Sequence, residues 1–270
     1  MQLNWMALKT TALSLVVLVL TGQGCRKQAP EVVVYTALDR EFSLPLLQEF
    51  EAQTGIRVRT KFDTESTKSV GLTSQIIAES KGRTRCDVFW NNEILNTIRL
   101  DQRNLLRETQ PKHLAEFPAE YYSENRHWFG FAARARILIV NTELVANEFL
   151  PDSIFDLLDE KWKGKIGMAK PLFGTTASHA ACLFEALGDE RARALFEGLK
   201  ANGIQIVSGN KQVAQDVASG RLAIGLTDTD DAMIEMENGH PVRIVYPDAS
   251  ADQLGTLFIP NTLSLLREAP

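Results

Sequence analysis

Short apolar strands alternate with amphipathic helices along the chain, and this alternation constrains the fold more than any other feature. Residues 31–37, EVVVYTA, form a β-branched run typical of a buried strand. Apolar residues at helical spacing follow over 42–50, and Gly55 marks the end of that helix. Two further strand-and-helix pairs follow, with strands over 56–62 and 86–90. A β-α-β-α-β-α series indicates a parallel sheet covered by helices.

A second α/β series over 153–245 indicates a second lobe, because 270 residues exceed what one small core needs. Two long strand-like segments, 128–141 and 255–266, flank this series and are predicted to cross between the lobes. We therefore expect an α/β fold of two lobes, residues 31–130 plus 255–270 and residues 131–254. Because no helix closes the first lobe after residue 266, we also expect the natural chain to continue beyond residue 270.

The N-terminal residues indicate export. One charge, Lys9, precedes a nine-residue apolar run over 12–20, which is too short to span a bilayer as a helix. A signal peptide over 1–24 is the interpretation that we favour over a buried N-terminal helix. The following LTGQGC resembles a bacterial lipobox, which implies a lipid on Cys25, a tether over 25–30 and attachment to a membrane at the periplasm or cell surface. Cleavage without lipid attachment remains open.

Charge and motifs exclude some functions. The formal net charge is -5 and the chain has no Lys/Arg block, which argues against a nucleic-acid partner. The chain also lacks GxSxG, HExxH, GxxxxGK(S/T), GxGxxG and CxxC motifs, so we favour a binding protein without a cofactor over an enzyme or a receptor-sensing module on the same fold. We also expect a monomer.

Seven segments in order resemble the periplasmic solute-binding proteins of ABC importers, in particular the iron(III)-binding branch. They are VVVYTA, GIRVR, CDVFWNNE, WFGFAARARILIVNT, EKWKGKIGM, KPLFGTT and SGRLAIGLTDTDD. The resemblance implies a type II periplasmic-binding-protein fold, capture of ligand between the lobes, and delivery to importer permease subunits.

Ligands of open α/β sheets bind beyond the carboxyl ends of the strands. Four such ends are polar here, and they provide the candidate ligand-binding residues Tyr35, Thr36, Asp39, Asn91, Asn92, Gly174, Thr175, Thr176, Asp228 and Thr229. The turn at Gly174 opens a helix and could hold an anion, or Thr175 and Thr176 could simply cap that helix. Arg134 and Arg136, in the first crossing segment, are either anion ligands or parts of a salt bridge between the lobes.

Asp230, Asp231 and Glu93 are the candidate metal ligands. In ferric-binding relatives two adjacent tyrosines occupy the places of Asp230 and Asp231. The resemblance therefore implies the fold and the transport role, but it does not extend to the iron specificity. Carboxylates are hard ligands that suit a hard cation, and they also suit an ammonium group. Ferric iron with a small anion is our leading expectation for the transported ligand, and a phosphorylated or amine-bearing metabolite is the alternative.

Replacing Cys25 with Ser tests the predicted lipid anchor. We expect the wild-type protein to fractionate with membranes and the variant to be released, because two acyl chains anchor a protein stably where one is marginal. Cell fractionation and immunoblotting measure this. A wild-type protein found wholly in the soluble fraction would contradict lipid attachment.

Overall fold

The computed structural model describes residues 29–63, 70–116 and 118–269, so the predicted signal peptide and Cys25 lie outside the described residues. The strands are β1 Glu31–Thr36, β2 Arg57–Phe62, β3 Val88–Asn91, β4 Phe129–Asn141, β5 Ile166–Ala169, β6 Gln205–Val207, β7 Ile224–Asp228, β8 Val242–Val245 and β9 Phe258–Leu265. The α-helices are α1 Arg40–Thr54, α2 Val70–Glu79, α3 Leu95–Gln102, α4 Gly174–Ala201, α5 Asn210–Ala218 and α6 Thr229–Glu237.

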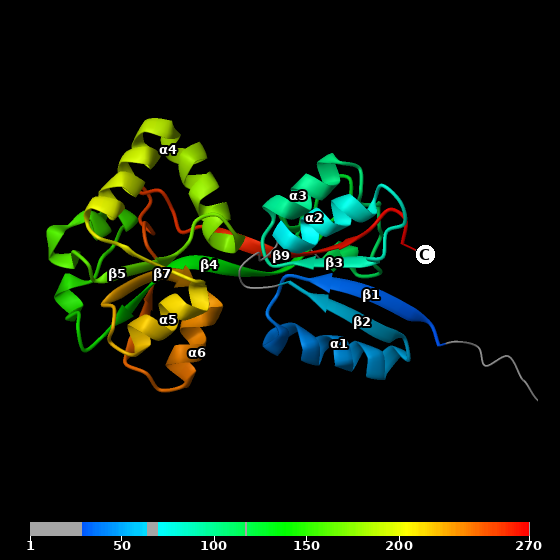
Figure 1. Ribbon diagram of the computed structural model, residues 1–270, viewed down its shortest axis with the longest axis horizontal. Coiled ribbons are helices and arrows are strands. Elements are labelled where there is room, and N and C mark those ends of the chain that lie inside the picture. Colours follow the sequence, from blue (N-terminus) through cyan, green and yellow to red (C-terminus); the bar gives the residue numbers. More distant parts are fainter. Residues whose placement is uncertain (1–28, 64–69, 117, 270) are drawn as a thin grey trace, which may run out of the picture.

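The strands form two lobes that meet along β4 and β9 (Figure 1). In the first lobe β2, β1 and β3 are parallel, and β9 adds to β3 in the antiparallel sense. In the second lobe β6, β5 and β7 are parallel, and β4 adds to β7 in the antiparallel sense. Helix α1 covers one face of the first sheet, whereas α2 and α3 cover the other (Figure 1). The expected two-lobed α/β fold is confirmed.

Strand β4 is long enough to serve both sheets. Its first half, 129–135, pairs with β9, and its second half, 136–141, pairs with β7 and β8. Arg136 donates its backbone N–H to Leu257 O, so the return segment runs beside β4 where the pairing changes. The division into 31–130 plus 255–270 and 131–254 remains a prediction, and this change of partner within β4 supports a boundary near its middle.

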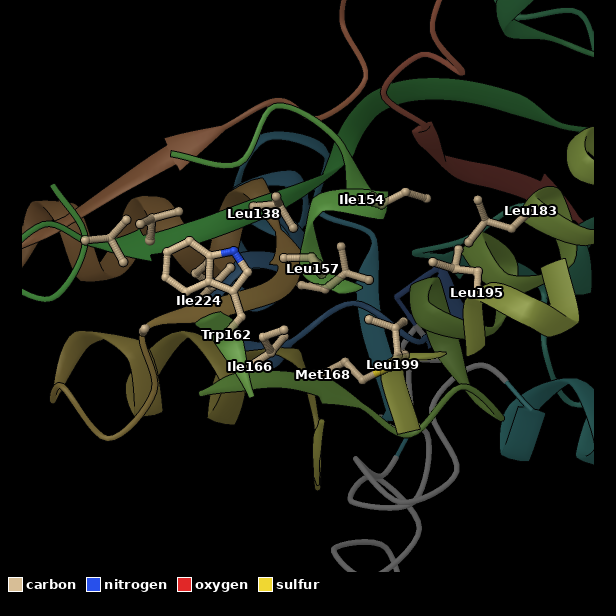
Figure 2. Close-up of a cluster of buried hydrophobic side chains, with 14 residues drawn as sticks. Leu138, Ile154, Leu157, Trp162, Ile166, Met168, Leu183, Leu195, Leu199 and Ile224 are labelled. Carbon is tan, nitrogen blue, oxygen red and sulfur yellow. The ribbon is translucent and has the colours of Figure 1, made fainter. Parts of the chain in front are cut away.

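Each lobe has its own apolar core. In the second lobe, α4 and the turns after β4 pack onto β4, β5 and β7 around Leu138, Leu157 and Ile224, none of which is exposed to solvent (Figure 2). In the first lobe, Phe89 and Ile76 belong to the cluster beneath α2 and α3. Because the cores are separate, each lobe can move as a unit about the two connecting strands.

The segment over 153–162, at the start of the second α/β series, contains no α-helix. It forms two 3₁₀ turns, Ile154–Leu158 and Glu160–Trp162, each of which has its first N–H groups capped by an oxygen of Ser153 or Asp159. The remaining 3₁₀ turns are Leu114–Glu116, Ala119–Tyr121 and Asn147–Phe149. Among the helices of the described ranges, none has both the length and the apolar character needed to cross a bilayer.

Helix α5 approaches β7 so closely that Gly225 has no room for a side chain. A Cβ atom there would lie 2.4 Å from Val213 Cγ1 and 3.0 Å from Ile139 Cγ2. This contact fixes α5, and with it the residues at its N-terminus, against the end of β7.

We therefore expect Gly225→Ala to lower the free energy of unfolding by about 1–3 kcal/mol, because the added methyl group overpacks the core. Urea denaturation followed by circular dichroism measures the change. Gly82→Ala is the control, since its nearest neighbour would be 4.0 Å away. Equal stabilities of the two variants would contradict the close packing.

Candidate ligand-binding cleft

The end of β7 and the first turn of α6 place three carboxylates close together between the lobes. All five residues of β7 are buried, and the strand ends at Asp228, where α6 begins. The first turn of α6 then places Asp230 and Asp231 beside Asp228, with one carboxylate oxygen of each lying within 4.8 Å of the others. The structure therefore brings together three predicted site residues that could hold a cation.

Asp228 and Arg136 form a buried ion pair at the floor of the site. Arg136 Nη1 lies 2.7 Å from Asp228 Oδ1, and the two side chains are 0% and 1% exposed. Burial alone would raise the pKa of Asp228, but the nearby Arg136, Arg134 and Thr175 outweigh burial and hold that pKa below its ordinary value. Asp228 is thus ionised at neutral pH, and its charge is matched inside the protein.

Asn210, the first residue of α5, connects the groups around Asp228. Its Nδ2 donates to Asp228 Oδ2 over 3.0 Å and to Thr175 Oγ1 over 2.8 Å. Its Oδ1 accepts from Arg136 Nη1 over 3.1 Å and from Thr176 Oγ1 over 3.0 Å. Asn210 therefore orients both partners of the ion pair and both threonines, although nothing in the sequence distinguished it from an ordinary helix-capping residue.

Arg134 reaches the same carboxylates from β4. Its Nη1 lies 2.8 Å from Asp230 Oδ2 and 3.8 Å from Asp228 Oδ2, and its Nη2 donates to Asn261 Oδ1 over 3.3 Å. Burial opposes its charge, but Asp230, Asp228 and Asp231 overcome this effect and raise the pKa of Arg134. The predicted contact of Arg134 with the cleft is therefore supported, whereas Arg136 is fixed in the floor.

Two helix N-termini face a small cavity beside Arg134. The cavity has a volume of about 40 Å³ and its lining includes Gly174, Thr175, Gly209, Asn210 and Asp231. Neither N-cap residue, Phe173 for α4 or Gly209 for α5, supplies a side-chain cap to the first N–H groups of its helix. Gly174 has a φ of 55°, which favours glycine at this turn. Backbone N–H groups and the aligned helix dipoles make this cavity suitable for a small anion.

A wider cleft opens from this cavity between the lobes. Its volume is about 710 Å³, with Asp39 and Glu41 among the lining residues of the first lobe and Ser208 and Lys211 among those of the second. Lys211 Nζ lies 2.8 Å from Glu41 Oε1 and so connects the lobes by an ion pair. Asp39 lies near enough to Arg134 and Lys211 to raise the pKa of both.

Glu93 connects the lobes more tightly. Its carboxylate accepts hydrogen bonds from the backbone N–H groups of Leu95 and Asn96 and from Asn91 Nδ2, all in the first lobe. Ser178 Oγ, on α4 of the second lobe, donates to Glu93 Oε2 over 3.0 Å. These four hydrogen bonds make Glu93 part of the contact between the lobes, and its role as a metal ligand stays a prediction.

Four other predicted site residues have structural partners. Tyr35 faces away from the cleft, because its hydroxyl donates to Glu79 on α2 and accepts from Gln75. Thr229 Oγ1 accepts from Ala135 N over 3.2 Å, and Thr36 Oγ1 accepts from Leu38 N over 3.1 Å. Asn92 lines the small cavity, whereas Asn91 is bonded within the first lobe. The strand-end rule thus predicted residues that meet in the candidate cleft, but not the direction of every side chain.

These features define a two-lobed α/β binding protein with a charged cleft. Residues 96–260 match the model of the family described as bacterial extracellular solute-binding protein, and the chain belongs to that family. It is 25% identical to the Fe(3+)-binding periplasmic protein of Serratia marcescens over 72% of this chain and 56% of that protein. It is also 25% identical to the major ferric iron-binding protein of Neisseria meningitidis, over 73% of this chain and 58% of that protein.

The chain is also similar in structure to a solved iron-bound protein. Iron-bound HitA from Pseudomonas aeruginosa superposes with a TM-score of 0.79 and 26% identity, covering 89% of this chain and 76% of that chain. The chain spans less than two thirds of the length of the two curated relatives that it matches.

The contact between Ser178 and Glu93 gives a test of lobe closure. We expect Ser178→Ala to shift the lobes toward an open arrangement, because a hydrogen bond to a charged group is worth about 1.5–3 kcal/mol. Small-angle scattering should show a larger radius of gyration than for the wild type. Ser219→Ala is the matched control, since its hydroxyl donates to Asp216 O three residues away in the same lobe. Superimposable scattering curves for Ser178→Ala and the wild type would contradict the proposed role.

Proposed function

We propose that this protein is the solute-binding component of an ABC-type importer and that it captures ferric iron with a small anion between its lobes. The observation that carries the proposal is the position of Asp228, Asp230 and Asp231, whose oxygens lie within 4.8 Å of one another beside two uncapped helix N-termini. Cation ligands and an anion-binding turn are thus adjacent in one cleft.

The acidic group supplies the ligands for the metal. Carboxylate oxygens are hard donors that suit a hard, highly charged cation. Asp231 lines the small cavity, and the neighbouring Asp230 side chain is 25% exposed. Asp39 adds a carboxylate from the first lobe. The names of the relatives from Serratia and Neisseria, which specify ferric iron, support the same cargo.

The turn at Gly174 supplies the anion site. The first residues of α4 and α5 line the same cavity, and Lys170 and Arg134 also line it. The anion would neutralise part of the metal's charge and occupy coordination positions that the carboxylates leave open.

The size of the cavity favours an ion over a large organic solute. Its volume of about 40 Å³ matches a few water-sized groups, whereas pockets for organic ligands typically measure about 300–1,000 Å³. The outer cleft of about 710 Å³ is large enough for a metabolite. That volume keeps a phosphorylated or amine-bearing solute as the second candidate.

Closure of the lobes around the ligand would prepare it for delivery to the permease subunits. A ligand that contacts both lobes binds the closed form better and shifts the population toward it, which gives permease subunits a shape to recognise. We propose that the protein is monomeric, performs no catalysis, and is anchored outside the cytoplasm by a lipid on Cys25.

Calorimetry of chelator-stripped protein tests the cargo. We expect micromolar or tighter binding of iron(III) citrate, and a loss of more than about 100-fold in affinity for the double variant Asp230→Asn with Asp231→Asn, because outer-shell changes alone cost 10–100-fold. The same titrations should include a panel of phosphorylated and amine-bearing metabolites.

The double variant Asp189→Asn with Glu190→Gln is the control. It removes the same two charges from an exposed part of α4, so it should bind like the wild type. Tight binding of an organic solute together with no binding of iron(III) citrate would overturn the iron assignment and leave the transport role in place.

A further inference from the structure

Arg134 occupies an unusual position, because its positive charge lies where the proposed metal ligands converge. Nη1 contacts Asp230 directly and also lies 3.8 Å from Asp228 Oδ2, while its side chain is 6% exposed. A cation bound to oxygens of Asp228 and Asp230 would lie close to this guanidinium, and the two positive charges would repel each other. Arg134 and the cargo therefore compete for the same carboxylates.

The two arginines of the site differ in how firmly they are held. Arg136 bonds to Asp228, Asn210 and Leu226 O and is completely buried. Arg134 lines the small cavity, and its Nε has no hydrogen-bond partner among the described residues. The Nε of Arg136 also has no partner among those residues, so the difference lies in position: Arg134 lines the cavity, where its guanidinium can reach an anion, whereas Arg136 does not line it.

Arg134 changes the net charge of the site. The three carboxylates and the two guanidinium groups leave one net negative charge at the floor of the site. A trivalent cation would then leave two positive charges in excess, which a divalent anion would neutralise. Without Arg134 the site would carry two net negative charges and would match a bare divalent cation.

We propose that Arg134 is the specificity-determining residue that makes cation binding depend on a bound anion. Its guanidinium takes the place of a cation among Asp228, Asp230 and Asp231, and turns to the anion when a cation and an anion bind together. The site therefore rejects bare divalent cations and accepts a cation paired with an anion. This inference rests on the proposed function, because it concerns the same site.

The test compares Mn²⁺ in chloride buffer with iron(III) citrate, using the wild type, Arg134→Gln and Arg134→Lys. Removing one unit charge near the carboxylates should raise the affinity for Mn²⁺ at least about tenfold in Arg134→Gln. The affinity of that variant for iron(III) citrate should fall at least about tenfold. Arg134→Lys keeps the charge and should reject Mn²⁺ as the wild type does.

Arg57→Gln is the matched control, because it removes one positive charge from a side chain that is 69% exposed on β2, in the first lobe. It should leave both affinities unchanged. Thermal melts establish that each variant is folded. If Arg134→Gln gains no affinity for Mn²⁺, or if Arg134→Lys binds Mn²⁺ better than the wild type does, the inference is wrong.

The proposed cargo and the proposed role of Arg134 can be contradicted separately. A wild-type protein that does not bind iron(III) citrate would overturn the proposed cargo. A tenfold gain of Mn²⁺ affinity in Arg134→Gln would still support the exclusion of bare cations by Arg134.

Discussion

The ion pair between Arg136 and Asp228 is the interaction on which the site depends. Two fully buried charges cost several kcal/mol each to desolvate, and such a pair persists only where further hydrogen bonds complete it. Here Asn210 and Thr175 complete the Asp228 carboxylate, and Leu226 O and Asn210 accept from Arg136. The pair thereby fixes β4, β7, α4 and α5 at one point. Replacing either partner would leave an unmatched charge in the core of the second lobe.

This arrangement means that the number of carboxylates does not decide what the cleft binds. The charge of Asp228 is largely balanced by Arg136 before any ligand enters. Asp230 contacts Arg134, while Asp231 lies on the cavity wall. The balance between these acids and Arg134, together with the N–H groups of α4 and α5, sets the charge that a ligand must bring. A cation and an anion entering together meet that requirement more closely than either ion alone.

Sequence periodicity predicted the lobes and the position of the site, but not the partners of individual side chains. The polar residues after β7 and before α4 met as expected, because parallel strands end at the same edge. Tyr35 was misplaced although strand alternation could have warned of it, since Val33 and Tyr35 share the face that packs against α2. Asn210 and Ser178 were missed because their partners lie 18 and 85 residues away, at Asp228 and Glu93. A local pattern contains no signal for such contacts.

The contacts between the lobes limit how ligand can enter. Ser178 is bonded to Glu93 and Lys211 to Glu41, so a separation of the lobes to admit a ligand would break both contacts. An exposed ion pair such as Lys211 with Glu41 is worth about 0–1 kcal/mol, whereas the bond to the buried Glu93 contributes more. Both contacts lie beside the candidate ligand residues and not at β4 or β9. Closure is therefore controlled at the mouth of the site, where a ligand contacting both Asp39 and Asp231 would reinforce the same bonds.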